Sequence, residues 1–386
     1  MRIVTGNAVR GEDFYNRENI IAKAWDFIES GSHLLIAAPR RIGKTSVMFY
    51  LRDHPKSGYT CTYLDSESVN NENEFFRRLV NRVLKTDFVQ KSQKVLTFLE
   101  KHMPTVKKVG PEGIEFGISD HHDYFEMFIK ILKSSRPEGQ KLIIMLDEFP
   151  ETLENIINDD GENAGRHFLQ SNRELRQDPE INDHVRFIYT GSIGLENIVS
   201  KLNAVNTIND LSRLEIPPLK ENEAKELINL LIQNVDFTLS DKLIGHILSQ
   251  IEWYIPFYIQ LIIEQLRNLY RDENLQRITK EAVDHAFTEM LKQRNHFEHW
   301  HLRLRSSIKG DEYNFVKELL NIVSENNTIH SNEIFNLAVK YHLENSHKDL
   351  LGTLIYDGYI NNNDDPSIYR YNSPILRMWW RRNVAN

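Results

Sequence analysis

The residues best suited to chemistry form one short segment, Ala38 to Thr45, which reads APRRIGKT. It follows an apolar run and precedes a stretch with helical periodicity. At such a junction the free N–H groups and the positive dipole end of a helix attract phosphate. Gly43 permits close backbone approach, Lys44 neutralises phosphate charge and Thr45 offers a hydroxyl to Mg²⁺. The segment therefore predicts a phosphate-binding loop of the Walker A type.

This motif predicts which residues surround the phosphate groups of ATP. We expect contacts from the loop and from the start of the helix, namely Pro39, Arg40, Arg41, Ile42, Gly43, Lys44, Thr45 and Ser46. Ala38 stands where G-x-x-x-x-G-K-[ST] has its first glycine, which fits the motif if Ala38 keeps a negative φ. A chance Gly-Lys-Thr in a strand–turn–helix is the alternative for the segment alone. Plain solvation is the alternative for the two loop arginines.

A second signal is the apolar run KLIIML, which ends in Asp147 and Glu148. In open α/β sheets, ligands bind outside the carboxyl ends of the strands. If this strand lies beside the strand that precedes the loop, Asp147 joins Thr45 in the shell of Mg²⁺. Glu148 then acts as general base towards the attacking water. Paired with the phosphate loop, this Walker B type of strand end predicts magnesium-dependent hydrolysis of ATP, with Lys44 and Glu148 as catalytic residues.

Two further strand ends carry polar residues. Thr190 and Ser192 follow the apolar run of RFIYTGS, where they would hydrogen-bond the γ-phosphate or the lytic water. We take Ser192 as a third catalytic residue; a simple Gly-Ser turn is the alternative. Asp65 also ends an apolar run, and we favour a turn-capping role for it over a role in the magnesium shell.

A parallel sheet is required to bring these strand ends together. The apolar runs predict strands at His33 to Ala38, Thr60 to Asp65, Lys141 to Asp147 and Val185 to Thr190. Helices are expected between them, at Lys44 to Leu51, Glu72 to Leu84, Asp123 to Lys133 and Ala164 to Arg176. The fold class is therefore α/β, with the core of a P-loop NTPase.

The pattern changes along the rest of the chain. We expect an α/β core over residues 1–215, a helical lid domain over 216–293 and a winged helix-turn-helix domain over 294–386. Residues 87–119 interrupt the α/β alternation, and VGPEGIEFGISD within them predicts a hairpin or loop. His296, His299 and His301 have spacing found in metal sites, but Phe297 and Trp300 between them favour a packed domain junction.

Composition excludes several classes of protein. The 386 residues carry a net charge of −8 at a pI near 6.0, so the overall field repels phosphate polymers. The single cysteine cannot form an internal disulfide. No run approaches the roughly 18 apolar residues of a membrane helix, and no secretory signal begins the chain. We expect a cytoplasmic protein that does not bind membranes.

Taken together, these residues resemble the archaeal-type ATPase family, a STAND-like branch of the AAA+ group. APRRIGKTS is similar to its P-loop, DEF to its acidic strand end and TGS to its polar sensor. GEDFYNREN resembles its F-x-x-R-E box, which implies that Phe14, Tyr15, Arg17 and Glu18 lie at the adenine. WYIPFYIQLI resembles its lid helix, which implies that Pro256 faces the nucleotide.

The resemblance implies an ATP-driven conformational switch, often linked to a genomic or defence partner. We expect this protein to use Mg²⁺, to self-associate on binding ATP and to act with a protein partner. It supplies no assignable arginine finger; Arg173, Arg176 and Arg186 are candidates, and an ordinary surface or helix-dipole role is favoured for each. A DNA-handling helper of the replication-initiator or transposition type is the alternative function. It would use Lys107 and Lys108 or the terminal arginines. Acidic residues such as Asp349 and Asp365 in the winged helix argue against DNA reading.

Overall fold

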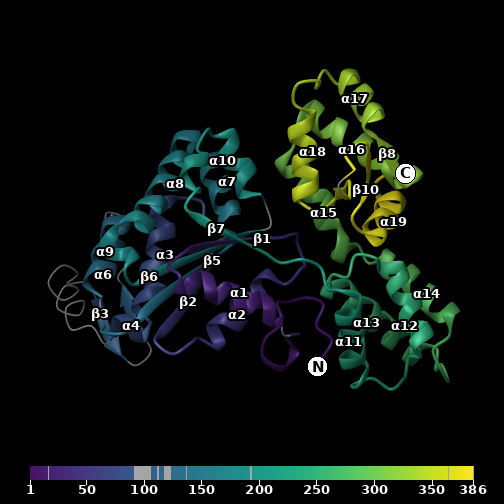
Figure 1. Ribbon diagram of the computed structural model, residues 1–386, viewed down its shortest axis with the longest axis horizontal. Helices are drawn as coiled ribbons and strands as arrows, with labels where there is room; N and C mark the ends of the chain where they lie inside the picture. The colour runs from purple at the N-terminus through teal and green to yellow at the C-terminus, as the bar shows by residue number, and fades with distance from the viewer. Residues whose placement is uncertain are drawn as a thin grey trace. The chain divides into compact units, whose positions relative to one another are not determined.

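The computed structural model describes residues 1–15, 17–90, 106–110, 113–116, 123–135, 137–191, 194–363 and 365–385; for 106–110 and 113–116 it describes the backbone alone. These residues form two compact units (Figure 1). One is an α/β unit, made of Asn16–Ala38 and Lys44–Ile216. The other is a helical unit, made of Met1–Tyr15, Pro39–Gly43 and Pro217–Asn386. Within the described ranges, no helix is both long and apolar enough to cross a membrane.

The α/β unit is built on a five-stranded sheet with the order β2-β5-β6-β1-β7. Its strands, all parallel to their neighbours, are β1 His33–Ala37, β2 Tyr59–Asp65, β5 Lys141–Asp147, β6 Val185–Gly191 and β7 Leu211–Glu215. The apolar runs predict the first four, because strands covered on both faces are apolar throughout. The edge strand β7 has no such run, since only Leu214 in it is buried.

The order of the strands corrects one expectation. β5, which ends in Asp147, does not lie beside β1, because β6 separates the two. β1 pairs with β6 from Leu34 opposite Ile188 to Ala37 opposite Gly191, and β6 pairs with β5 on its other side. The residues of the two motifs therefore have to meet across an intervening strand.

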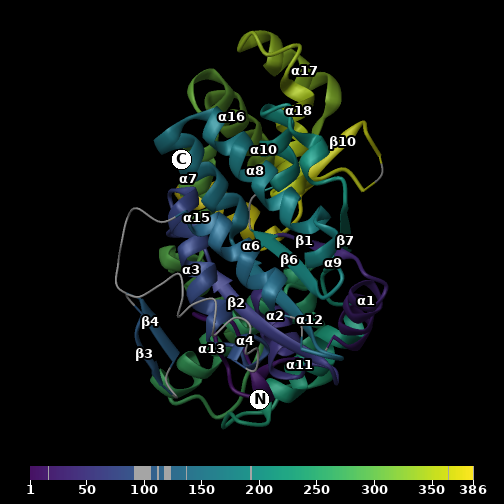
Figure 2. The same cartoon turned by 90° about the vertical axis from the view of Figure 1, so that its left-hand side faces the viewer.

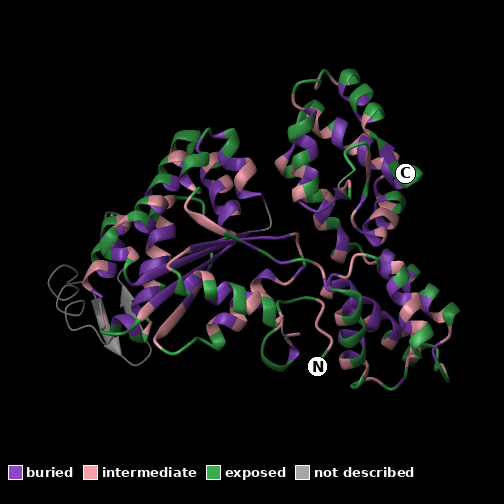
Figure 3. Ribbon diagram, viewed as in Figure 1, coloured by how far each residue is buried: buried purple, intermediate pink, exposed green. Residues whose placement is uncertain are grey.

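Helices cover both faces of the sheet. They are α1 Glu18–Glu29, α2 Lys44–Asp53, α3 Glu72–Leu84, α4 Asp87–Gln90, α6 Tyr124–Ser134, α7 Phe149–Asp160, α8 Glu162–Gln177, α9 Pro179–Asn182 and α10 Leu195–Lys201, with the short helix η2 Val205–Thr207. α1 and α2 lie on one face and α3, α6 and α8 on the other (Figure 1). Within the second of these layers, α3 and α6 lie side by side (Figure 2). The three central strands, β1, β5 and β6, are buried almost throughout, whereas the edge strands β2 and β7 are only partly buried (Figure 3).

The segment between α4 and α6 contains a two-stranded antiparallel hairpin. β3, Val106–Gly110, pairs with β4, Gly113–Phe116. The segment predicted as a hairpin or loop therefore contains a hairpin, whose first strand begins at Val106, before the predicted segment. Lys107 and Lys108 belong to β3, of which the structure describes the backbone alone.

The helical unit begins with the short helix η1, Gly11–Asp13. Its main elements are α11 Glu221–Ile232, α12 Asp241–Ile251, α13 Pro256–Asp272, α14 Lys280–Lys292, α15 Arg294–Ser307, α16 Gly310–Asn326, β8 Thr328–His330, α17 Ser331–Lys340, α18 His347–Tyr356, β9 Ile360–Asn361, β10 Ile368–Tyr371 and α19 Pro374–Asn383. From α16 to β10 the order is a helix, a short strand, two helices and two short strands; the winged helix over 294–386 stays a prediction. The small sheet has the antiparallel order β8-β10-β9.

Aromatic side chains pack where α15 meets the end of the chain. Phe297 and Trp300 are buried, and the ring of Phe297 stacks on Trp379 with centroids 5.9 Å apart. The hydroxyl of Tyr359 donates to the carbonyl of Trp300 at 2.6 Å. The packing predicted for Phe297 and Trp300 is therefore observed, whereas the domain boundary expected beside them stays a prediction. Among the described residues, no group of three or more His, Cys, Asp or Glu side chains is arranged to hold a metal ion.

Candidate nucleotide-binding site

The phosphate loop connects β1 to α2, which begins at Lys44. Two of its residues have a left-handed backbone, Arg41 with φ 64° and Gly43 with φ 106°. Gly43 reaches this conformation without strain because it has no Cβ, whereas a side chain at Arg41 costs on the order of 1 kcal/mol. Ala38 is not among the described residues with positive φ, so it meets the condition for replacing the first glycine of the motif.

Lys44 holds its ammonium group close to the start of the loop. The side chain is buried, and Nζ donates a hydrogen bond of 2.8 Å to the carbonyl of Ala38. A buried ammonium group requires such acceptors because it has lost its water shell. The first turn of α2 also leaves backbone N–H groups without partners inside the helix, as every helix start does. Ser46 lies in this turn and is buried.

Thr45 and Asp147 meet directly, although β6 lies between their strands. Oγ1 of Thr45 donates to Oδ2 of Asp147 at 2.7 Å. The hydroxyl of Tyr63, from β2, donates to the same oxygen at 2.9 Å, and the backbone N–H of Glu148 donates to Oδ1 at 3.1 Å. One hydroxyl and one carboxylate thus lie together, and both are oxygen ligands of the kind that Mg²⁺ prefers. This donor set fits the metal predicted from the sequence.

The charge of Asp147 is costly in this position. The side chain is 3% exposed, and burial raises the pKa of Asp147 above its ordinary value. The neighbouring Glu148 raises it further, while the hydrogen bonds from Thr45 and Tyr63 act in the opposite direction. Burial and then the charge of Asp147 raise the pKa of Tyr63, so its hydroxyl stays protonated and donates. A bound cation would offset the cost of burying this carboxylate.

Glu148 lies at the N-cap of α7 with φ 54° and ψ 36°, a left-handed conformation that is uncommon for glutamate. The turn is held from β2, because both N–H and Oγ of Ser66 donate to the carbonyl of Asp147, at 3.1 and 2.9 Å. Oγ1 of Thr152 donates in turn to the carbonyl of Ser66 at 2.7 Å. Strained residues that the surroundings hold in place are typical of functional sites.

The third strand end, on β6, is described only in part. Thr190 is fully buried, and its Oγ1 has no hydrogen-bond partner among the described residues. Ser192, expected to be catalytic, lies outside the residues that the structure describes. Gly191 approaches α7 closely: a Cβ there would lie 2.2 Å from Cδ of Pro150. Packing alone therefore explains the glycine of this TGS segment.

The remaining predicted contacts are divided between the two units. Arg17 precedes α1 in the α/β unit. Phe14, Tyr15 and Pro256 belong to the helical unit, where the hydroxyl of Tyr15 donates to Oε2 of Glu226 at 2.7 Å. Pro256 is the first residue of α13. The structure brings Lys44, Thr45, Asp147 and Glu148 together within one unit; the adenine contacts stay a prediction.

The loop residues Pro39–Gly43 group with the helical unit. The guanidinium group of Arg41 lies 4.6 Å from the ring centroid of Phe257, and burial lowers the pKa of Arg41. Gly358 approaches Pro39 so closely that an added Cβ would lie 3.0 Å from its Cβ. Ile42 is buried. Packing therefore involves Pro39 and Ile42, whereas Arg41 as a whole is exposed, with its guanidinium group over the ring of Phe257.

Two of the arginine-finger candidates have structural roles. Arg176 is buried and pairs with Asp210 at 2.7 Å. Arg186 is also buried, and its Nη1 donates to the carbonyl of Val185 at 2.8 Å. Both lie near the amino ends of the strands, at the edge of the sheet opposite to Asp147. Neither is therefore a surface arginine, but Arg176 does lie in the last turn of α8 and donates to the carbonyl of Asn172, in agreement with the helix-dipole role.

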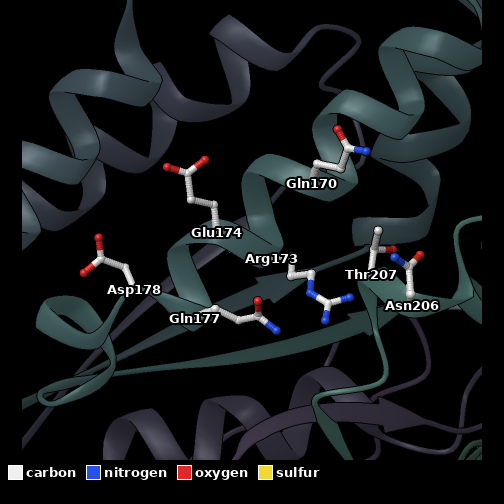
Figure 4. Close-up of a pocket in the computed structure, with 7 residues that line it drawn as sticks. All are labelled: Gln170, Arg173, Glu174, Gln177, Asp178, Asn206 and Thr207. Atoms are coloured by element: carbon white, nitrogen blue, oxygen red, sulfur yellow. The ribbon is translucent and has the colours of Figure 1, made fainter.

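Arg173 lines a pocket of about 480 Å³ in the α/β unit, formed by α8 and the segment around η2. Figure 4 shows Arg173 between Gln177 and Asn206. The neighbouring Asp178 and Thr207 precede β6 and β7, so this pocket also lies at the amino ends of the strands. It is separate from the Thr45–Asp147 site.

Sequence reasoning missed Tyr63, Ser66 and Thr152 as parts of the site. None belongs to a motif. Tyr63 and Ser66 reach Asp147 only because β2 lies beside β5, and Thr152, on α7, donates to the carbonyl of Ser66. For Tyr63 and Ser66 the one signal in the sequence is a polar residue near the carboxyl end of a strand. Asp65 has the predicted capping role, since Oδ1 accepts from the N–H of Glu67 at 3.1 Å.

Comparisons with known proteins agree with this geometry at the level of the fold. No protein-family model matches the chain, and no curated protein matches it. Among solved structures, it is similar to the Walker-type ATPase PABY2304 of Pyrococcus abyssi, with a TM-score of 0.65, 16% identity, and coverage of 99% of this chain and 100% of that one. It is also similar to the ORC2 protein of Aeropyrum pernix in ADPNP–ADP complexes, with a TM-score of 0.58, 11% identity, and coverage of 93% and 90%. The chain therefore has the fold of the P-loop NTPases, with a parallel α/β core followed by a helical region.

Proposed function

We propose that this protein is a magnesium-dependent ATPase of the AAA+ group that works as a switch of the STAND type. The observation that carries the proposal is the hydrogen bond between Thr45 and Asp147, beside a buried Lys44 and a left-handed Gly43. A hydroxyl, a carboxylate and an ammonium group at the start of one helix suit a nucleoside triphosphate with its metal ion. A simple structural turn requires none of them.

Binding uses the loop and the first turn of α2. The backbone around Gly43 and the N-terminus of α2 receive the phosphate groups, and Lys44 exchanges the carbonyl of Ala38 for phosphate oxygens. Thr45 and Asp147 would hold Mg²⁺, which would supply positive charge against the phosphate groups. Phe14, Tyr15, Arg17 and Pro256 contact the base, a role supported only by the resemblance of their segments to the archaeal-type ATPases.

Hydrolysis uses Glu148 as general base. Its carboxylate accepts a proton from water while the water oxygen attacks the γ-phosphorus. The bond from that phosphorus to the bridging oxygen breaks, and ADP and phosphate leave. Ser192 orients the water or the γ-phosphate. The left-handed backbone of Glu148, fixed through Ser66, supports a catalytic role over a passive one.

The switch consists of three parts, a nucleotide core over residues 1–215, a lid over 216–293 and a winged helix over 294–386. ATP would hold the parts in one arrangement and hydrolysis would release them. We propose that the protein is cytoplasmic and self-associates when ATP binds. Exposed Phe335, Val339 and Ile355 on α17 and α18 support a protein partner over DNA, because apolar side chains gain nothing from phosphate.

The first test compares ATP turnover in wild type, Lys44→Ala and Lys130→Ala. Lys130 is an exposed lysine of the same unit and serves as the matched control. We expect turnover in wild type and in Lys130→Ala and none in Lys44→Ala. Equal turnover in all three proteins would contradict the assignment of the site.

A further inference from the structure

Tyr63 lies on the edge strand β2, outside both nucleotide motifs. Its ring packs against Phe49 with centroids 4.9 Å apart, and the guanidinium group of Arg52 lies 5.8 Å from its centroid. Phe49 and Arg52 belong to α2, the helix that begins at the phosphate loop. The ring is therefore held between the sheet and this helix, and its hydroxyl points at Asp147.

The hydroxyl of Tyr63 completes the set of donors around one carboxylate. Oδ2 of Asp147 accepts from Thr45 at 2.7 Å and from Tyr63 at 2.9 Å. Oδ1 accepts from the N–H of Glu148 at 3.1 Å. A carboxylate oxygen has two lone pairs in its plane, so two donors on Oδ2 define the rotation of the whole group. Removing one of them leaves the carboxylate free to turn.

Thr45 depends on that rotation. With its proton directed at Oδ2 of Asp147, its oxygen lone pairs are free to face a metal ion. A carboxylate that turns away would release the proton of Thr45 to other acceptors, and the two metal ligands would lose their common orientation. Outer partners of metal ligands act in this way, and their loss typically lowers metal affinity by about 10- to 100-fold.

We propose that Tyr63 is a positioning residue of the magnesium site: its hydroxyl fixes the carboxylate of Asp147, and through it the hydroxyl of Thr45, in the orientation that receives Mg²⁺. This inference rests on the proposed function of the same site. It assigns to β2 a role in metal binding that neither motif contains. The ring of Tyr63 contributes packing, and the hydroxyl alone contributes to the metal site.

The test uses Tyr63→Phe, which keeps the ring and removes the hydroxyl. Tyr59→Phe is the matched control, because Tyr59 lies on the same strand at its opposite end. Binding of a fluorescent, non-hydrolysable ATP analogue is measured while Mg²⁺ is titrated, and again in EDTA. We expect the Mg²⁺ concentration for half-maximal binding to rise about 10-fold in Tyr63→Phe, with unchanged binding in EDTA. Tyr59→Phe should match wild type in both measurements.

A second background separates positioning from a general loss of structure. In Asp147→Ala there is no carboxylate for Tyr63 to hold, so adding Tyr63→Phe should not change the dependence on Mg²⁺ any further. A further loss in this background, or a Tyr63→Phe titration equal to wild type, would overturn the inference. If wild type itself binds no nucleotide, the proposed function fails. If wild type binds nucleotide and Tyr63→Phe matches it, only the role of Tyr63 fails.

Discussion

The hydroxyl of Thr45 donates a hydrogen bond of 2.7 Å to Oδ2 of Asp147, 102 residues further along the chain. Their strands are not neighbours, because β6 lies between β1 and β5. The contact forms because α2 starts at the carboxyl edge of the sheet and Asp147 ends its strand at the same edge. Several consequences of this arrangement are open to measurement.

Asp147→Asn should raise thermal stability and raise the Mg²⁺ concentration needed for ATP binding. Burial raises the pKa of Asp147, so the folded protein disfavours the charged form. The folded state therefore binds more protons than the unfolded state, and the charge lowers stability once the pH exceeds the ordinary carboxyl pKa of 3.8. The amide of asparagine is uncharged, so burying it does not carry this loss of stability. Between pH 3 and 8, the unfolding midpoint of Asp147→Asn should rise further above that of wild type as the pH increases. Parallel curves for the two proteins would contradict the prediction.

Gly191→Ala should destabilise the α/β unit and impair turnover. The new methyl group would lie 2.2 Å from Cδ of Pro150, in the first turn of the helix that Glu148 caps. Overpacking of this kind typically costs about 1–3 kcal/mol. Gly245→Ala provides the contrast. Gly245 lies in the helix α12, and a Cβ added there would meet no atom within 4 Å, so the variant should be more stable than wild type by roughly 0.5–1 kcal/mol. Denaturant midpoints should be lower than that of wild type for Gly191→Ala and higher for Gly245→Ala; the reverse order would contradict the prediction.

His33→Leu should weaken the pH dependence of stability in the acid range. Burial and then the charge of Arg176 lower the pKa of His33 to about 4, from an ordinary value of 6.5. The unfolded chain takes up the proton first, so this histidine favours folding above pH 6.5, and that contribution is lost as the pH falls towards 4.

The hydrogen bonds of His33 define its neutral form. The N–H of Phe187 donates to Nδ1 at 3.0 Å, so Nε2 carries the proton and faces the carbonyl of Arg176. His54→Leu, which replaces an exposed histidine of the same unit, is the control. Unfolding midpoints from pH 4 to 7 should fall less steeply in His33→Leu than in this control. The same slope in both proteins would count against the assignment.

The sequence predicts most of the α/β unit because its strands are apolar on both faces and its phosphate loop has a strict pattern. It does not predict β7, since an edge strand with one buried residue carries no apolar run. The sequence also does not predict the contacts of Tyr63 and Ser66 with Asp147, because these contacts depend on β2 lying beside β5. Nor does the sequence predict the ion pair of Arg176 with Asp210, because only the folded chain brings together these partners 34 residues apart.

Glu148→Gln should bind ATP as wild type does and hydrolyse it about 10²- to 10⁴-fold more slowly, because the amide cannot accept the proton of water. The left-handed backbone of Glu148 tolerates this change, since the side chain keeps its size. The variant therefore traps the ATP state. Size-exclusion chromatography with light scattering should detect a larger species with ATP and not with ADP or without nucleotide. A mass that stays constant in all three conditions would contradict assembly on ATP binding and would leave the switch to act on a separate partner.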